Sequence, residues 1–176
     1  AHVDGRLLDI AENAGARLIN RDRMWHYVEG IENWDPIWPK HAIRILPGPS
    51  SLWLDARGNR LPTPLWPGFD TLGTLKYLRS TGHDHSWFIL DQSIAKREFA
   101  LSGSEQNPDL TGKSWLQVAR RAIGKKAPAP VEAFKQHGKD FVVRDNLRDL
   151  VDGMNALTPD APLSYEKVRA EVEARD

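Results

Sequence analysis

Three consecutive residues, Trp25, His26 and Tyr27, carry the side chains best suited to acid/base chemistry. An imidazole can carry a proton near neutral pH, and a tyrosine hydroxyl can protonate or polarise a carbonyl group. The same residues could instead form an aromatic packing strand with one hydrogen-bonded imidazole. His26 and Tyr27 are therefore either a catalytic pair or part of a core.

A polar loop between residues 102 and 109 is the second candidate site. It contains Ser102, Glu105, Gln106 and Asn107. Turn-rich loops of this kind often hold binding residues on a rigid scaffold, and Glu105 could act as an acid or a base. The alternative is an ordinary surface connection that turns at Asn107-Pro108. We expect these four side chains to contact a ligand if the loop faces a site.

The segment His83-Asp84-His85 would place two imidazoles on one face of an extended chain, which is one way to hold a metal ion. No third ligand follows at a suitable spacing, so a solvated turn is the simpler interpretation and we predict no metal site. The chain has no cysteine. This excludes disulfides, zinc–thiolate sites and cysteine nucleophiles, and it fits a reducing cytoplasm.

Nucleotide-binding glycine motifs are absent from the sequence. Neither G-x-G-x-x-G nor G-x-x-x-x-G-K-[ST] occurs, so the chain cannot hold a nucleotide through the usual glycine-rich loop. The G-x-S-x-G elbow of α/β-hydrolases is also absent. A nucleotide cofactor would therefore have to be bound mainly by residues outside this chain.

The composition indicates one domain with no marked affinity for nucleic acids or membranes. The chain has 176 residues, with 24 basic and 24 acidic side chains that balance to zero net charge. A balanced charge predicts no nucleic-acid partner, and no apolar run approaches the ~18 residues of a membrane span. The sequence starts without methionine and stops within a helical pattern, so we expect a piece of a longer protein.

The elements that must position these side chains are short. Apolar periodicity and capping residues predict helices over residues 4–13, 70–78, 91–99, 113–123, 130–137, 146–154 and 164–174. Strands are expected over residues 16–20, 24–30, 42–46, 51–55, 86–90 and 140–143. Because helices and strands do not alternate regularly, the sequence favours an α+β fold, with a small mixed or antiparallel sheet surrounded by helices.

The stretch G-P-S-S-L-W-L-D-A-R-G-N-R-L-P, residues 48–62, predicts a hairpin. Leu52 and Leu54 alternate with more polar neighbours, and Gly58-Asn59 suits a tight turn before a return strand from Arg60. This stretch resembles the G-G-I-L-V-N-x-x-G-K-R-F hairpin of the fumarate reductase flavoprotein superfamily.

The wider chain is similar to bacterial FAD-binding dehydrogenases related to 3-ketosteroid Δ1-dehydrogenases and fumarate reductases. The runs that carry the resemblance are G-A-R-L-I-N-R-D-R-M-W-H-Y-V-E-G-I (15–31), N-W-D-P-I-W-P (33–39), R-I-L-P-G-P-S-S-L-W-L-D (44–55), P-G-F-D-T-L-G-T-L (67–75) and F-A-L-S-G-S-E-Q-N-P-D-L-T-G-K-S (99–114).

The resemblance implies a plan for the whole protein. Such proteins have a Rossmann-like FAD domain interrupted by an α+β capping domain that closes over the flavin. Residues 1–176 would be that capping domain, its partner would be the protein's own FAD-binding domain, and FAD would be bound mainly there. Ser50 and Ser51, at the start of the hairpin, are expected near the flavin edge.

The resemblance also bears on the substrate. Fumarate reductases carry a proton-donating arginine shortly after the hairpin, and this place falls at Gly68 in a stretch without arginine. A small apolar substrate such as a 3-ketosteroid needs no arginine, and Trp25 and Trp53 are then candidate contacts. Two alternatives stay open: a fumarate reductase-like enzyme acting on a small acid, and a non-catalytic module that binds an apolar ligand or partner.

Overall fold

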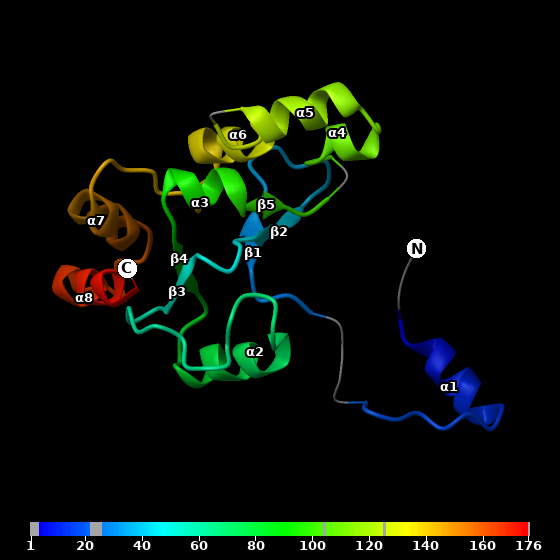
Figure 1. Ribbon diagram of the computed structural model, residues 1–176. Coiled ribbons are helices and arrows are strands. Elements are labelled where there is room, and N and C mark those ends of the chain that lie inside the picture. The colour runs from blue at the N-terminus through cyan, green and yellow to red at the C-terminus, as the bar shows by residue number, and fades with distance from the viewer. Residues whose placement is uncertain (1–3, 22–25, 104, 125, 176) are drawn as a thin grey trace.

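The computed structural model describes residues 4–21, 26–103, 105–124 and 126–175 (Figure 1). In chain order the elements are α1 Arg6–Asn13, β1 Gly30–Glu32, β2 Ala42–Leu46, β3 Leu52–Asp55, α2 Thr71–Ser80, β4 Ser86–Ile89, α3 Gln92–Arg97, β5 Ala100–Leu101, α4 Pro108–Thr111, α5 Trp115–Ile123, α6 Ala129–His137, α7 Leu147–Leu157 and α8 Tyr165–Arg175. Helix α1 lies apart from the other elements (Figure 1) and buries no side chain.

Two small antiparallel sheets form the β part of the fold. The first has the strand order β1-β2-β5, and the second pairs β3 with β4. Gly30 lies opposite Arg44 in the first sheet, and Leu54 lies opposite Trp87 in the second. Helices and antiparallel strands are not arranged in β-α-β units, so the predicted α+β class is confirmed.

Side-chain caps set the start of several helices, as the sequence predicts for polar residues ahead of an apolar periodic segment. The carboxylate of Asp70 accepts a hydrogen bond from Gly73 N at 2.8 Å before α2. Asp91 does the same for Ile94 N before α3, and Asn146 accepts from Asp149 N before α7. Each cap satisfies a backbone donor that the first helical turn leaves unpaired.

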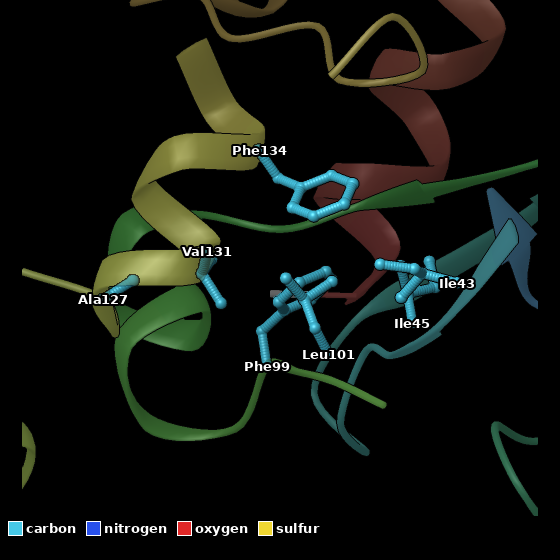
Figure 2. Close-up of a cluster of buried hydrophobic side chains, with 7 residues drawn as sticks. All are labelled: Ile43, Ile45, Phe99, Leu101, Ala127, Val131 and Phe134. Carbon is cyan, nitrogen blue, oxygen red and sulfur yellow. The ribbon is translucent and has the colours of Figure 1, made fainter. Parts of the chain in front are cut away.

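The first hydrophobic core lies between the three-stranded sheet and α6 (Figure 2). Figure 2 shows Phe134 and Val131 on α6 pointing toward the strand residues Ile43 and Ile45. Phe134 is fully buried; the ring of Trp34 lies edge-on to it, and the ring of Phe141 is tilted against it. The remaining buried members are Phe99, Leu101 and Ala127.

The second core lies beside the β3-β4 sheet and is closed by α7 and α8. Its buried members are Leu52, Leu54, Val151, Met154, Leu163 and Val168. Successive side chains of a strand point to opposite faces, and β4 uses both faces. Trp87 and Ile89 pack against this second core, whereas Phe88 and the following Leu90 pack against the first.

Three predicted strands are wrong. Of residues 26–30, the described part of the strand predicted over residues 24–30, only Gly30 lies in a strand, where it starts β1. Residues 16–20 and 140–143 form no strand. Residues 16–20 have no neighbouring strand in the described part of the chain, and Asn20 has a positive φ of 54° that breaks an extended run. In residues 140–143, the side chain of Asp140 accepts the Glu32 N–H at 2.9 Å, so a carboxylate occupies the place of a ladder hydrogen bond. Strand propensity without a backbone partner does not produce a strand.

The predicted hairpin is correct in its first strand and its turn but not in its pairing. Strand β3 pairs mainly with β4, and Arg60 forms only one isolated bridge, to Leu54. The turn is held by Asp55, whose carboxylate accepts hydrogen bonds from Arg57 N at 2.8 Å and from the backbone and side chain of Asn59 at 2.9 Å. Gly58 has the positive φ, 75°, that this turn requires.

Within the described part of the chain, no helix combines the length and the apolar character needed to cross a lipid bilayer.

We predict that Asp55→Asn destabilises the protein at neutral pH. Burial alone raises the pKa of Asp55, but the hydrogen bonds from Asn59 and Arg57 outweigh it and lower the pKa below its usual value. The stabilisation is therefore present at neutral pH and is lost as the pH falls through the folded-state pKa. Asparagine cannot accept all of these donors, so the free energy of unfolding should fall by about 1–3 kcal/mol.

Tryptophan fluorescence during urea unfolding between pH 7 and pH 3 measures this effect. The difference between Asp55→Asn and the unaltered protein should shrink toward the acid end. Asp152→Asn changes an exposed carboxylate on α7 and is the matched control. A difference that stays constant with pH would contradict the assigned role of the Asp55 charge.

Candidate functional site

Tyr27 lies just before β1 and is about half exposed, at 48%. The side chain of Arg44, in the middle of β2, lies over its ring, with the guanidinium carbon 4.2 Å from the ring centroid. A guanidinium at this distance is attracted by the negative face of the aromatic ring. The chain therefore places a cation against the tyrosine that the sequence marked as an acid/base candidate.

Glu29 holds Arg44 in this position. Its carboxylate is 3.3 Å from Arg44 Nε, and the residue is only 3% exposed. The backbone brings the two together, because Ile45 N donates to the carbonyl oxygen of Glu29 at 2.9 Å. A buried carboxylate requires a charged or hydrogen-bonding partner, so Arg44 is the natural partner of Glu29. The buried charge fixes the guanidinium, and the guanidinium supports the ring of Tyr27.

Tyr27 and Glu29 border a large groove of about 1590 Å³. Tyr27, Glu29 and the neighbouring β1 residues line one part of it, and residues 82–91, Leu78 of α2 and Leu150 of α7 line others. Its volume exceeds the ~300–1,000 Å³ of most small-molecule sites. The groove can therefore hold a polycyclic molecule and still leave room for a second group.

The other half of the predicted catalytic pair, His26, is partly buried in the segment before β1. Trp25, predicted to contact the substrate, lies outside the residues that the structure describes.

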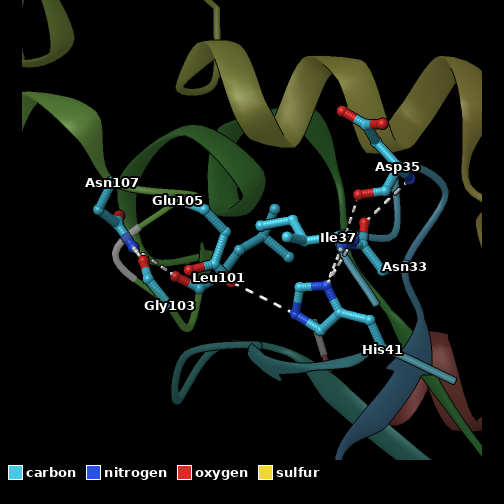
Figure 3. A network of polar contacts seen from close by, with 8 residues as sticks. All are labelled: Asn33, Asp35, Ile37, His41, Leu101, Gly103, Glu105 and Asn107. Carbon is cyan, nitrogen blue, oxygen red and sulfur yellow. Dashed lines mark hydrogen bonds and ion pairs between the residues drawn. The ribbon is translucent and has the colours of Figure 1, made fainter. Parts of the chain in front are cut away.

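A second polar network surrounds His41 (Figure 3). This histidine is 5% exposed and stacks on the ring of Trp38. Its Nδ1 is 3.0 Å from Asn33 Nδ2 and accepts the Ile37 N–H at 3.3 Å. Its Nε2 is 3.5 Å from the carboxylate of Glu105. The network joins the Trp/Pro segment 33–41 to the polar loop that follows β5.

The hydrogen bonds around His41 determine which ring nitrogen carries the proton. A backbone N–H can only donate, so the Ile37 contact requires a lone pair on Nδ1. The Asp35 N–H donates to Asn33 Oδ1 at 3.1 Å, which orients the amide so that its NH₂ group faces Nδ1 and Asp35 O. The proton must then lie on Nε2, directed at Glu105. His41 and Glu105 are thus an oriented imidazole–carboxylate pair.

Hydrogen bonds hold both ends of the polar loop, at Ser102 and at Asn107. Ser102 N donates to the carbonyl oxygen of Arg44 at 2.9 Å, so the loop starts beside the strand that supports Tyr27. The amide of Asn107 donates to the carbonyl oxygens of Leu101 and Gly103 at 2.8 and 2.7 Å. Gln106 is partly buried. The structure brings Ser102 and Arg44 together, and it turns Asn107 toward its own loop.

Ser50, Ser51 and Trp53 lie in a different place, around the start of β3. Ser51 is 6% exposed and its hydroxyl donates to the carbonyl oxygen of Pro47. Ser50 N donates to Glu98 Oε2 at 2.9 Å. The indole of Trp53 is buried, donates to Ser86 Oγ at 3.0 Å and stacks on the Phe88 ring at 4.6 Å.

The imidazoles of His83 and His85 are neighbours, with ring centroids 6.0 Å apart. No cluster of three or more His, Cys, Asp or Glu side chains suited to a metal ion occurs in the described residues.

Sequence reasoning missed Glu29, Arg44, Asn33 and His41. Each is a polar residue within or beside an otherwise apolar or aromatic stretch, and such residues need internal partners when the stretch is buried. That signal was available from the sequence. The identity of the partners was not, because Glu105 and His41 belong to distant segments.

Residues 1–175 match the family described as the FAD binding domain. The chain is 62% identical over 176 residues to a KsdD-like steroid dehydrogenase of Mycolicibacterium smegmatis, a match that covers 100% of this chain and 32% of that protein. It is 61% and 60% identical to KsdD-like steroid dehydrogenases of two Mycobacterium tuberculosis strains, again over 100% of this chain and 31% of each of those proteins.

The chain thus belongs to the FAD-binding domain family, whose cofactor is FAD, and it spans about a third of the length of the curated relatives it matches. No solved structure matches it.

The fit of FAD to the residues predicted to bind it can be judged from their contacts. The donors at Ser50 N and Ser51 Oγ are already used inside the chain, by Glu98 and Pro47. These two donors are therefore not free to bind the flavin edge, and the placement of Ser50 and Ser51 near the flavin stays a prediction. The groove beside Tyr27 has the volume for a flavin ring and a substrate together.

We predict that His41 is the Nε2–H tautomer at neutral pH. Long-range ¹⁵N–¹H correlation spectra of the protein labelled at histidine should show Nδ1 unprotonated and Nε2 protonated. The same tautomer should persist in Glu105→Gln, because Ile37 and Asn33 set it. A proton on Nδ1 in either protein would contradict the derived network.

Proposed function

We propose that residues 1–176 are the substrate-capping part of an FAD-dependent dehydrogenase that acts on a 3-ketosteroid-like substrate in the cytoplasm. The family match supports the cofactor, and the names of the relatives support the substrate class. The relatives are about three times as long as this chain, which supports a separate source for most of the FAD contacts.

One observation carries the proposed chemistry: the ring of Tyr27 is supported by Arg44 and the buried Glu29 at the border of the groove. In this proposal the phenol of Tyr27 exchanges a proton with the substrate, and His26 provides a second acid/base group. FAD, when bound, supplies a hydride acceptor. The overall reaction removes a proton and a hydride from adjacent carbons of the substrate.

Arg44 and Glu29 are positioning residues in this proposal. The guanidinium lies over the face of the ring, and so it restricts the ring without competing for the hydroxyl. Apolar side chains elsewhere in the groove, such as Leu78 and Leu150, would exclude water from an apolar substrate.

A small-acid reductase is the second candidate, and Arg44 is the observation that bears on it. Arg44 does not line the groove, but its guanidinium lies over the ring of the groove-lining Tyr27, and a guanidinium can bind a carboxylate. Arg44 is already paired with Glu29 through Nε, so its charge is largely balanced. This pairing favours an uncharged substrate over a dicarboxylate.

We predict that Tyr27→Phe slows anaerobic reduction of the bound flavin by a 3-ketosteroid by about 10²- to 10⁴-fold, because it removes the acid/base hydroxyl but keeps the ring. Stopped-flow absorbance of the complete protein encoded by the gene measures the rate. Tyr165→Phe in α8 is the matched control, because an arginine lies over this ring as well: the guanidinium carbon of Arg148 is 3.8 Å from the ring centroid of Tyr165. Equal rates for Tyr27→Phe and Tyr165→Phe would refute the role of Tyr27.

We also predict that the flavin of the complete protein is bleached by a 3-ketosteroid and that its dithionite-reduced form is not reoxidised by fumarate. Visible absorption spectra measure both. Reoxidation by fumarate without bleaching by steroids would establish the small-acid alternative. A complete protein that binds no FAD would favour the non-catalytic module.

A further inference from the structure

The groove contains two buried polar atoms that the proposed chemistry does not use. Nε2 of His85 and Nε1 of Trp87 are buried and have no hydrogen-bond partner among the described residues. Both residues line the groove, and their rings meet edge to face with centroids 5.6 Å apart. An unpartnered polar atom in a buried place is unfavourable, so a ligand group that pairs with both atoms would gain from filling this position.

The two atoms have opposite hydrogen-bonding character. His85 Nδ1 is 3.3 Å from Asp84 Oδ1, and this hydrogen bond is the main reason why the pKa of Asp84 lies below its usual value. An ionised carboxylate only accepts, so Nδ1 carries the proton and Nε2 of the neutral ring presents a lone pair. Trp87 Nε1–H can only donate. One acceptor and one donor therefore belong to two rings that meet edge to face.

This combination selects a hydroxyl group. A hydroxyl can donate its proton to His85 Nε2 and accept the Trp87 Nε1–H with its oxygen. A ketone could use only the Trp87 donor, and its oxygen would face the lone pair of His85. A carboxylate would meet the same lone pair with a full negative charge.

The surroundings indicate the rest of the ligand. Leu78, Leu150 and Leu157 line the same groove, and the His85 side chain is a quarter exposed, at 25%, so its ring borders the open space. We infer that His85 and Trp87 form a binding site for the hydroxyl group of an otherwise apolar ring compound. The inference concerns binding alone and does not depend on the chemistry assigned to Tyr27.

The test uses the complete protein labelled with ¹⁵N at the tryptophan indoles, with Trp87→Phe to identify the Trp87 resonance. The probes are decahydro-2-naphthol and its ketone, 2-decalone, which share one apolar bicycle. Decahydro-2-naphthol should shift the Trp87 indole resonance in a saturable manner. The ketone should bind about five- to tenfold more weakly, which is the effect of one neutral hydrogen bond.

Two histidine variants complete the experiment. His85→Phe keeps a ring against Trp87 but removes the acceptor, so its preference for the alcohol should disappear. His83→Phe makes the same change at a nearby imidazole whose Nε2 already accepts from Arg57 at 3.4 Å, and it should keep the preference. The other indole resonances report whether each variant is folded.

A Trp87 resonance that decahydro-2-naphthol does not move would overturn the inference, since a water molecule or nothing would then be the natural occupant. Equal affinity for the alcohol and the ketone in the unaltered protein would overturn it as well. Both results are independent of flavin reduction, so they leave the proposed function untouched.

Discussion

Strand β4 separates the two hydrophobic cores, because each of its faces packs against one of them. This four-residue strand alternates its side chains between the two cores, with Phe88 on one side and Trp87 on the other. The period of two in an extended chain makes this division unavoidable. Helix α6 is held to one core and α7 to the other, so the groove between them is defined by one short strand.

Two polar pairs on or beside β2 each combine a buried member with a more exposed one. Glu29 is buried, and its partner Arg44 reaches the partly exposed Tyr27. His41 is buried, and its partner Glu105 lies in the more exposed polar loop. In both cases the buried member sets the geometry, because it has few alternatives once desolvated. The buried member then holds the exposed member in a fixed position.

Local signals in the sequence predicted much of the fold. The cap Asp70 and the alternation in residues 51–55 depend on neighbours within a few positions, and the elements they predict, α2 and β3, are present. Long-range partners were not predictable. Strand β3 pairs with β4 rather than with its own hairpin return, because the pairing depends on packing against both cores.

In the candidate site, too, the sequence predicts local features but not long-range contacts. The sequence identified Tyr27 by its chemistry and Glu105 by its loop, and their roles stay predictions. Their companions Arg44 and His41 are brought to them by β2, and no spacing rule in a single sequence encodes this placement. The failed strand at residues 140–143 has a related cause, because the side chain of Asp140 rather than its backbone meets β1.

Strand β2 carries Arg44, and the residue immediately before the strand is His41, so one short segment holds a member of each polar pair. His41, immediately before the strand, points to the same face as Ile43 and Ile45, while Arg44 points to the other. A shift of this strand by a single residue against β1 would drive the guanidinium into the apolar core and expose both isoleucines. Such a shift is therefore strongly disfavoured. The free-energy cost of exposing Ile43 and Ile45 to water fixes the register of β2. The same register fixes the distance between Arg44 and His41, so the placement of these two polar groups follows from core formation.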